Sequence, residues 1–139
     1  MNDRSQPMRA LAAQVLLSVE NGQSLTQCLP LALNRLAPNE RPELQALCYG
    51  TCRWFHRLDD ELNQRLNKPL RKPDRVIHHL MLVALFQLRH SQQATYAVLN
   101  ETVEACRALG KPNLTGLVNG VLRGAEREGA LEASSDAAR

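Results

Sequence analysis

The amino-acid sequence predicts an all-helical domain, and two observations carry that prediction. The chain of 139 residues is 44% hydrophobic and 22% charged, as a globular protein is, but only 4% aromatic, whereas β-sheets favour aromatic and β-branched residues. Apolar residues recur three and four positions apart through most of the sequence, which is the spacing of one helix face. We therefore expect a bundle of six or seven helices with short connections.

The first two predicted helices flank a turn. An apolar stripe over residues 8–19 predicts the first helix, and Asn21-Gly22 suits a left-handed cap at its end. Ser24 followed by Gln27 fits a capping box that starts the second helix. Pro30 lies inside that second segment, so we expect either a kink or a later helix start there.

The third stripe is long. It runs from Leu44 to Leu66, after Pro42 in a predicted first turn. One kinked helix and two consecutive helices both fit it, and the sequence leaves the two alternatives open. A basic loop follows, and Pro73 opens the next helix, whose wide apolar face over residues 76–88 marks it as the central one.

Two further helices complete the predicted bundle, over residues 98–109 and 114–125, with Gly110 ending the first of them. After Gly129 the sequence consists mainly of alanine, serine and charged residues. We therefore expect a folded domain over residues 1–128 and the frayed start of a linker over residues 129–139.

The composition also limits where the protein can be located and what chemistry it can perform. The N-terminus is polar, and no apolar run approaches the roughly 18 residues of a membrane span. We expect a cytoplasmic protein with no membrane partner, whose four cysteines are reduced thiols. Cys48, Cys52 and His56 recur every four residues, but the outer two lie about 12 Å apart along a helix, so no metal site is predicted.

No catalytic residue is predicted either. Thr51-Cys52 resembles the dipeptide that holds the nucleophile in RNA cytosine-C5 methyltransferases, but Cys52 falls on a buried helix face. A nucleophilic thiol needs access and a lowered pKa. His78 and His79 point in different directions on their helix and have no obvious acid partner, so we interpret them as flanking residues.

Cations and aromatic residues suggest contacts with nucleic acid. Residues 53–57, Arg-Trp-Phe-His-Arg, interleave the two types as single-strand binding surfaces do, although on a helix they face all round. Residues 65–75 hold five cations against one anion, a local charge of +4. Such cations can converge on phosphates, and a solvated charged loop is the alternative. The candidate phosphate contacts are Lys68, Arg71, Lys72 and Arg75, with Arg9, Lys111 and Arg123 second.

Two segments resemble a known fold. Val98-Leu99-Asn100-Glu101-x-x-Glu104 and Leu117-Val118-Asn119-Gly120-Val121-Leu122-Arg123 are similar to the paired signature of the NusB-like RNA-binding fold. The resemblance covers about residues 8–128 and implies two small packed helical sub-bundles. We expect Asn100 and Asn119 to bridge helices by hydrogen bonds, because buried amides must be satisfied.

Within that fold the chain looks like the N-terminal domain of Sun-type (RsmB) small-subunit ribosomal-RNA cytosine-C5 methyltransferases. Residues 21–30, 47–53 and 111–123 carry this closer resemblance. It implies ribosomal RNA and the parent's own methyltransferase domain as partners. It also implies that S-adenosylmethionine binds in that missing catalytic domain, with no cofactor in this chain. A stand-alone antitermination factor and a protein-docking domain that never touches RNA are the alternatives.

Overall fold

The computed structural model describes residues 7–130, and within that range it contains helices and no strand. The seven α-helices are α1 (Met8–Glu20), α2 (Leu25–Leu33), α3 (Arg41–Arg53), α4 (Phe55–Arg65), α5 (Arg75–His90), α6 (Thr95–Ala108) and α7 (Thr115–Glu128). Three short 3₁₀ turns precede α3, α5 and α7. The all-helical prediction and its helix number are confirmed. The predicted linker residues 131–139 lie outside the described residues.

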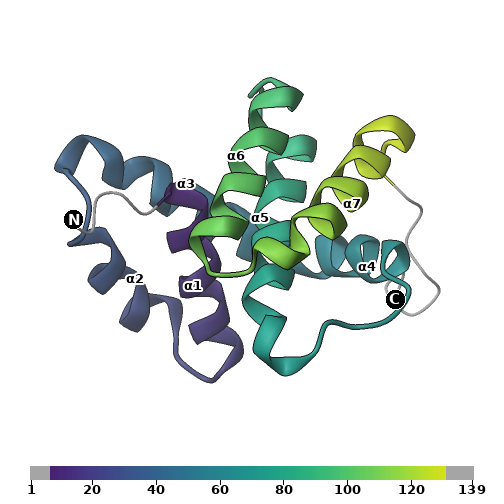
Figure 1. Ribbon diagram of the computed structural model, residues 1–139. Helices are drawn as coiled ribbons and strands as arrows, with labels where there is room; N and C mark the ends of the chain where they lie inside the picture. Colours follow the sequence, from purple (N-terminus) through teal and green to yellow (C-terminus); the bar gives the residue numbers. More distant parts are fainter. Residues whose placement is uncertain (1–6, 131–139) are drawn as a thin grey trace.

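The helices form two sub-bundles, each with its own hydrophobic core (Figure 1). The first core joins α1, α2 and α3 through residues such as Leu11, Leu29 and Leu44. The second joins α4, α5, α6 and α7. Helices α1 and α5 pack on each other where the sub-bundles meet, because Ala10 of α1 belongs to the second core and Val83 of α5 to the first. The expected pair of packed sub-bundles is therefore present.

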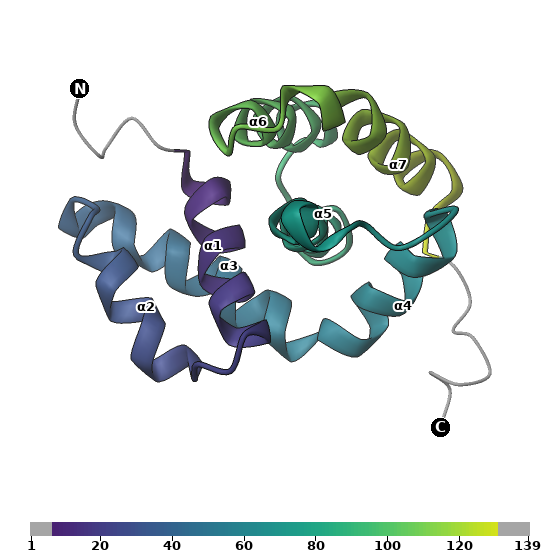
Figure 2. The same cartoon turned by 60° about the horizontal axis from the view of Figure 1, so that its bottom comes forward.

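Helix α5 is the centre of the molecule. Figure 2 views it nearly end-on, with α4, α6 and α7 around one side and α1 on the other. Every residue from Ile77 to Leu85 is buried, as expected for a helix that is apolar on all sides. The polar residues of α5 must therefore find partners on the surrounding helices.

The turn between α1 and α2 follows the sequence signals. Gly22 adopts a φ of +110°, which favours glycine. The backbone N–H of Gln27 donates to Ser24 Oγ at 3.2 Å, and the N–H of Ser24 donates to Gln27 Oε1 at 3.1 Å, which confirms the capping box. Helix α2 begins at Leu25 and continues through Pro30, so a later start is wrong. Pro30 is exposed, so water can bond the carbonyl that lacks its N–H.

The long third stripe forms two helices, separated by Trp54 alone. Trp54 has φ −102° and ψ 16°, outside the helical range, and the next helix begins at Phe55. This single residue sends α3 into the first core and α4 into the second. The Trp54 ring stacks on His90 of α5 with ring centroids 4.4 Å apart.

Helix α3 approaches α5 closely at Gly50. A Cβ atom at this position would lie 2.1 Å from Cζ of Phe86. Only glycine leaves room for that ring, which packs against both cores. The contact fixes α3 against the centre of the molecule.

Arg9 is a buried structural residue and not a surface cation. It is 4% exposed. Its Nε donates to Gln87 Oε1 at 2.6 Å, its Nη2 donates to Gln93 Oε1 at 2.9 Å, and its Nη1 pairs with Glu101. Arg9 therefore joins α1 to α5, to the following turn and to α6. The predicted contact of Arg9 with phosphate would first have to break these bonds, because its guanidinium is buried and already bonded.

His78 and His79 are buried and each has an acid partner. Nε2 of His78 lies 2.7 Å from Asp59 Oδ1 on α4, and Nε2 of His79 lies 2.7 Å from Glu20 Oε1 on α1. The interpretation of the two histidines as flanking residues without partners is therefore wrong. The carboxylates come from other helices, which spacing along one helix does not reveal. Together the pairs fasten α1 and α4 to the start of α5.

Glu20 and His79 have shifted pKa values. The hydrogen bond from Arg75 is the largest cause that lowers the pKa of Glu20 from 4.5 to about 2, and the His79 bond adds to it against the opposing effect of burial. Burial lowers the pKa of His79 below 6.5 and outweighs the attraction of Glu20. Nδ1 of His79 is buried without a partner, so a proton there would be an unsatisfied donor.

Replacing Arg9 with alanine should destabilise the fold by about 2 kcal/mol, because Gln87 then loses its buried donor. Urea unfolding of the variant would measure the change. Arg107→Ala is the matched control, since Arg107 pairs with Glu104 while both side chains are at least half exposed. That control should stay within about 0.5 kcal/mol of the parent. Equal losses in the two variants would contradict the structural role of Arg9.

Acid should destabilise the domain in two steps. Below pH 6.5, His79 is protonated in the unfolded chain but stays neutral in the folded one, because its folded pKa is lower. The free energy of unfolding that His79 contributes above pH 6.5 is therefore lost as the pH falls. Glu20 adds a second loss between 4.5 and about 2, because its folded pKa is the lower one.

The variant His79→Gln separates the two steps. It should flatten the unfolding free energy between about pH 7.5 and about pH 5.5, and leave the loss at lower pH in place. Urea titrations of both proteins across this range would show it. Identical slopes for parent and variant in the upper window would contradict the His79 assignment.

Candidate nucleic-acid interface

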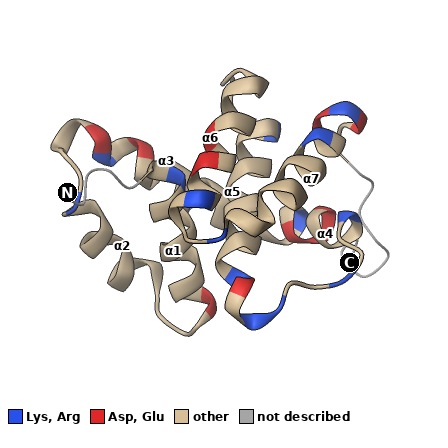
Figure 3. Ribbon diagram, viewed as in Figure 1, with Lys and Arg blue, Asp and Glu red and all other residues tan. Residues whose placement is uncertain are grey.

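The cationic loop between α4 and α5 runs alongside α7. At the α4 end, Arg65 Nη1 lies 2.9 Å from Glu128 Oε1, and Nη2 donates to the Gly129 carbonyl at 2.9 Å. Near the α5 end, Lys111 Nζ lies 3.0 Å from Asp74 Oδ1, just before α7 begins. The loop is therefore tied to both ends of α7. Figure 3 shows its lysines and arginines between α4 and α5.

Three cations of this loop are available to a ligand. Lys68, Arg71 and Lys72 are exposed, and none has an acid partner among residues 7–130. Leu70, half-buried between them, packs against the second core and anchors the loop. We call these three residues the basic loop. Their position lets them approach phosphates without first breaking an ion pair.

The other cations of residues 65–75 are already paired. Arg65 bonds Glu61 at 3.0 Å as well as Glu128, with its side chain only 7% exposed. Arg75 donates from Nε and Nη2 to the two carboxylate oxygens of Glu20. The local charge of +4 is therefore larger than the positive charge that a ligand would encounter, because acidic residues distant in the sequence neutralise part of it.

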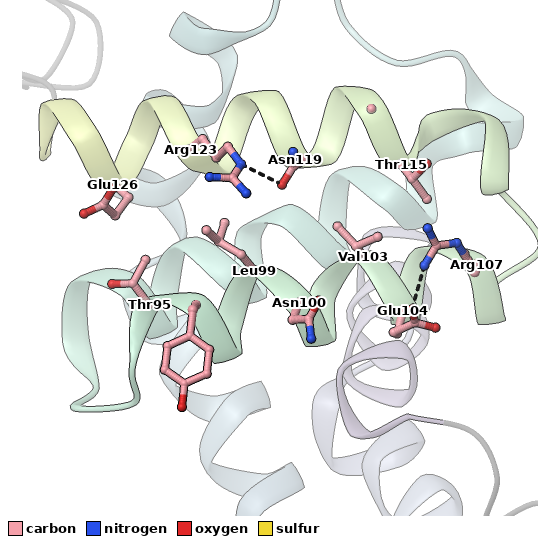
Figure 4. Close-up of a pocket in the computed structure, with 12 residues that line it drawn as sticks. Thr95, Leu99, Asn100, Val103, Glu104, Arg107, Thr115, Asn119, Arg123 and Glu126 are labelled. Atoms are coloured by element: carbon pink, nitrogen blue, oxygen red, sulfur yellow. Dashed lines mark hydrogen bonds and ion pairs between the residues drawn. The ribbon is translucent and has the colours of Figure 1, made fainter.

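Of the second set of predicted contacts, Lys111 and Arg123 remain at the surface. Lys111 is about a quarter exposed and pairs with Asp74. Arg123 is exposed, and its Nε donates to Asn119 Oδ1 at 3.2 Å within α7. Figure 4 shows that Arg123 faces the groove between α6 and α7. The structure therefore places Lys111 beside the cationic loop and Arg123 at the groove between α6 and α7.

The groove between α6 and α7 has a volume of about 980 Å³ and is mostly polar. Asn100 lies on its α6 side, exposed and without a side-chain hydrogen bond among the described residues. Asn119 lies on its α7 side and, within residues 7–130, bonds only Arg123 of the same helix. The expectation that these two amides bridge helices is wrong, because Asn119 bonds within its own helix and Asn100, exposed on α6, has no side-chain hydrogen bond among residues 7–130 (Figure 4).

Buried charges form a network that sequence reasoning missed. Glu61 of α4 is 5% exposed and binds both Arg65 and Arg89 of α5. Arg89 also donates to the Ala125 carbonyl of α7 at 3.1 Å. The network secures the C-terminal end of α7 against α4 and α5. The only indication of this network in the sequence is that a charged residue, Glu61, stands among the apolar residues of α4.

The Thr51-Cys52 dipeptide does not acquire catalytic geometry. Cys52 borders an apolar pocket of about 380 Å³, and burial raises the pKa of its thiol. Burial also raises the pKa of Cys48, to about 12. Neutral thiols are weak nucleophiles. No group of three potential metal ligands occurs among residues 7–130.

Trp54 has a structural role at the helix break. Its ring stacks on His90 at an interplanar angle of 12°, and the Arg53 guanidinium carbon lies 5.7 Å from the ring centroid. Phe55 packs against the second core. A nucleobase at Trp54 would therefore compete with contacts inside the protein.

None of the helices described between residues 7 and 130 has the length and apolar character needed to cross a membrane.

The comparisons with known proteins agree with this fold. The sequence profile of the NusB family matches residues 6–127. The ribosomal RNA small subunit methyltransferase B of Vibrio vulnificus is 43% identical over 122 residues, which are 87% of this chain and 29% of that protein. The Citrobacter koseri protein of the same name is 37% identical over 126 residues, 90% of this chain and 29% of its own.

This chain therefore spans less than a third of the length of the curated relatives that it matches. Its seven helices, its two packed cores and the family profile over nearly the whole sequence lead to one assignment. The chain belongs to the NusB family.

Proposed function

We propose that the chain is the RNA-binding N-terminal module of an S-adenosylmethionine-dependent ribosomal-RNA cytosine-C5 methyltransferase. The observation that carries the proposal is its 43% identity, over 87% of its length, to a ribosomal RNA small subunit methyltransferase. Because that relative is more than three times as long, the methyl transfer belongs to polypeptide that this chain does not cover. A cytoplasmic location follows from ribosomal RNA as the partner.

The basic loop is the proposed contact with RNA. Its cations Lys68, Arg71 and Lys72 are exposed and unpaired within residues 7–130, and Leu70 holds their backbone in place. A cation without an internal partner gains most from a phosphate, because no existing ion pair is lost. Arg75 and Lys111 each share an acid group, so their contribution is smaller.

Residues 7–130 do not fit S-adenosylmethionine. Methyltransferases of the proposed class hold this cofactor on a Rossmann-like sheet, and the described part of the chain is helical throughout. We therefore derive no catalytic step from these residues. The module supplies affinity and orientation for RNA, and the remaining polypeptide supplies the cofactor and the reacting groups.

Two alternatives predict different observations. A stand-alone antitermination factor requires that the reading frame end near Arg139, whereas a methyltransferase continues for several hundred residues. A protein-docking domain requires that the chain bind no RNA at any salt concentration. The identity to the methyltransferases favours the proposed function over both.

Charge reversal of the basic loop tests the RNA contact. The triple variant Lys68→Glu, Arg71→Glu, Lys72→Glu should weaken binding to small-subunit ribosomal RNA by at least tenfold at low salt. If three phosphates are contacted, the slope of log affinity against log salt should also become shallower by about 2 to 3. Fluorescence anisotropy across a potassium chloride series measures both quantities.

The triple variant Arg35→Glu, Arg107→Glu, Arg127→Glu is the matched control. It makes the same change in net charge at exposed positions outside the loop and outside residues 53–57. It should retain most of the affinity and nearly all of the slope. Equal losses in both triple variants would mean that only overall charge matters, and unchanged binding in the loop variant would refute the assignment.

A further inference from the structure

Trp54, the only tryptophan of the sequence, lies at the surface on a stack of rings. Its ring is parallel to that of His90 within 12°, with the centroids 4.4 Å apart. The His90 ring in turn lies 5.7 Å from that of Phe86, which packs against both cores. The stack therefore runs from the surface to the interior and holds the Trp54 ring at a fixed angle. We call Trp54 and His90 the ring platform.

The ring platform keeps a large aromatic surface in contact with water. Trp54 is 37% exposed, and His90 is exposed as well. Among residues 7–130 no second ring stacks on Trp54. Complete burial of such a ring would contribute hydrophobic free energy that this position does not gain. An exposed ring with a fixed orientation is available to stack on a flat partner.

Two arginines next to the ring platform have no acid partner. Arg53 and Arg57 are exposed, and neither forms an ion pair among residues 7–130. The acidic side chains that follow in α4 are bonded elsewhere, as Asp59, Asp60 and Glu61 each contact another side chain. The positive charge beside the rings is therefore available to a phosphate group.

A nucleobase on Trp54 would compete with Arg53. The guanidinium carbon of Arg53 lies 5.7 Å from the centroid of the Trp54 ring, near the outer limit of a cation–π contact, and such contacts are weak at exposed sites. His90 keeps its own face of the ring, because a base needs only one. The displaced guanidinium would lie near the phosphate of the stacked nucleotide, so a charge-assisted bond offsets the contact that is lost.

The combination of flat rings and unpaired cations favours a nucleotide over a peptide. Proteins that bind single strands combine cations that meet the phosphates with aromatic rings on which the bases stack. An apolar peptide would cover the rings but leave both arginines without a partner. A duplex cannot use such a ring either, because its bases are already stacked on one another and side chains cannot read the deep groove of A-form RNA. The platform therefore suits a base in a loop, a bulge or a single strand.

We propose that the ring platform binds one unpaired nucleobase of the RNA by stacking on Trp54, while Arg53 and Arg57 contact the adjoining phosphates. The inference rests on the proposed function and adds a second, separate contact to it. Helix α5 has 16 residues and begins next to the basic loop, so its last residue, His90, lies about 22 Å away along the helix axis. The basic loop meets phosphates whether or not the bases are paired, whereas the platform requires a free base.

The fluorescence of the single tryptophan tests the proposal in the unmodified chain, because a base stacked on the indole ring quenches its emission. A short single-stranded RNA of mixed sequence should quench the emission strongly at saturation. The same strand annealed to its complement is the matched control. It should still bind at low salt through the basic loop, as fluorescence anisotropy of a labelled strand would show, but leave the tryptophan emission nearly unchanged.

Two variants of the same residue separate stacking from apolar bulk. Trp54→Leu should weaken single-strand binding by about tenfold at every salt concentration, because the aromatic face is lost. The slope of log affinity against log salt should change little, unlike in the basic-loop variant. Trp54→Phe keeps a ring and should retain most of the affinity. Tyr96→Leu is the control, since Tyr96 is 78% exposed on α6, and it should bind as the parent does.

Failure of this proposal is distinguishable from failure of the RNA-binding function. Binding of the single strand without quenching would refute the platform, leave its rings to a protein partner and retain the RNA function. Equal quenching by the single strand and the duplex would also overturn the proposal, as would equal losses of affinity in Tyr96→Leu and Trp54→Leu. No binding of either RNA would refute both proposals. The fluorescence measurement needs no variant, so it remains decisive even if Trp54→Leu does not fold.

Discussion

The burial of α5 on all sides is the constraint on which the rest of the structure depends. Polar side chains in the buried part of such a helix have little access to water, so they depend on bonds from the neighbouring helices. His78 bonds Asp59 and His79 bonds Glu20. Gln87 bonds Arg9 of α1, and Arg89 bonds Glu61 of α4 and the Ala125 carbonyl of α7. These bonds set where the outer helices lie, because a buried donor or acceptor left alone would cost more than the bond contributes.

The same constraint decides which charges remain for function. Arg9, Arg75 and Arg89 are all basic in the sequence, yet their guanidinium groups are bonded inside the protein. Among residues 7–130, Lys68, Arg71 and Lys72 of the basic loop are exposed and have no acid partner. The groove between α6 and α7, in contrast, is lined by both arginines and glutamates, so its charges are balanced.

Sequence patterns predicted those features that depend on neighbours along the chain. The apolar stripes gave the helices, and Ser24 with Gln27 gave the start of α2, because their partners are three or four residues away. The roles of Arg9 and His79 depend on residues 78 and 59 positions away, which spacing on a helix does not encode. The exposure of Asn100 was missed for the same reason, since only the packing of α6 against α7 decides which amide faces solvent.

The one-residue joint at Trp54 has a consequence for how this domain tolerates changes in length. Each residue advances a helix by about 100°, so deleting one position near the joint would rotate α4 by that angle relative to α3. Leu58 and Leu62 would then turn out of the second core toward water. Longer loops elsewhere can accommodate insertions, but the single residue between α3 and α4 cannot. The rotation of α4 about its own axis is therefore fixed by that of α3. The apolar face of α4 meets the second core only when that of α3 meets the first.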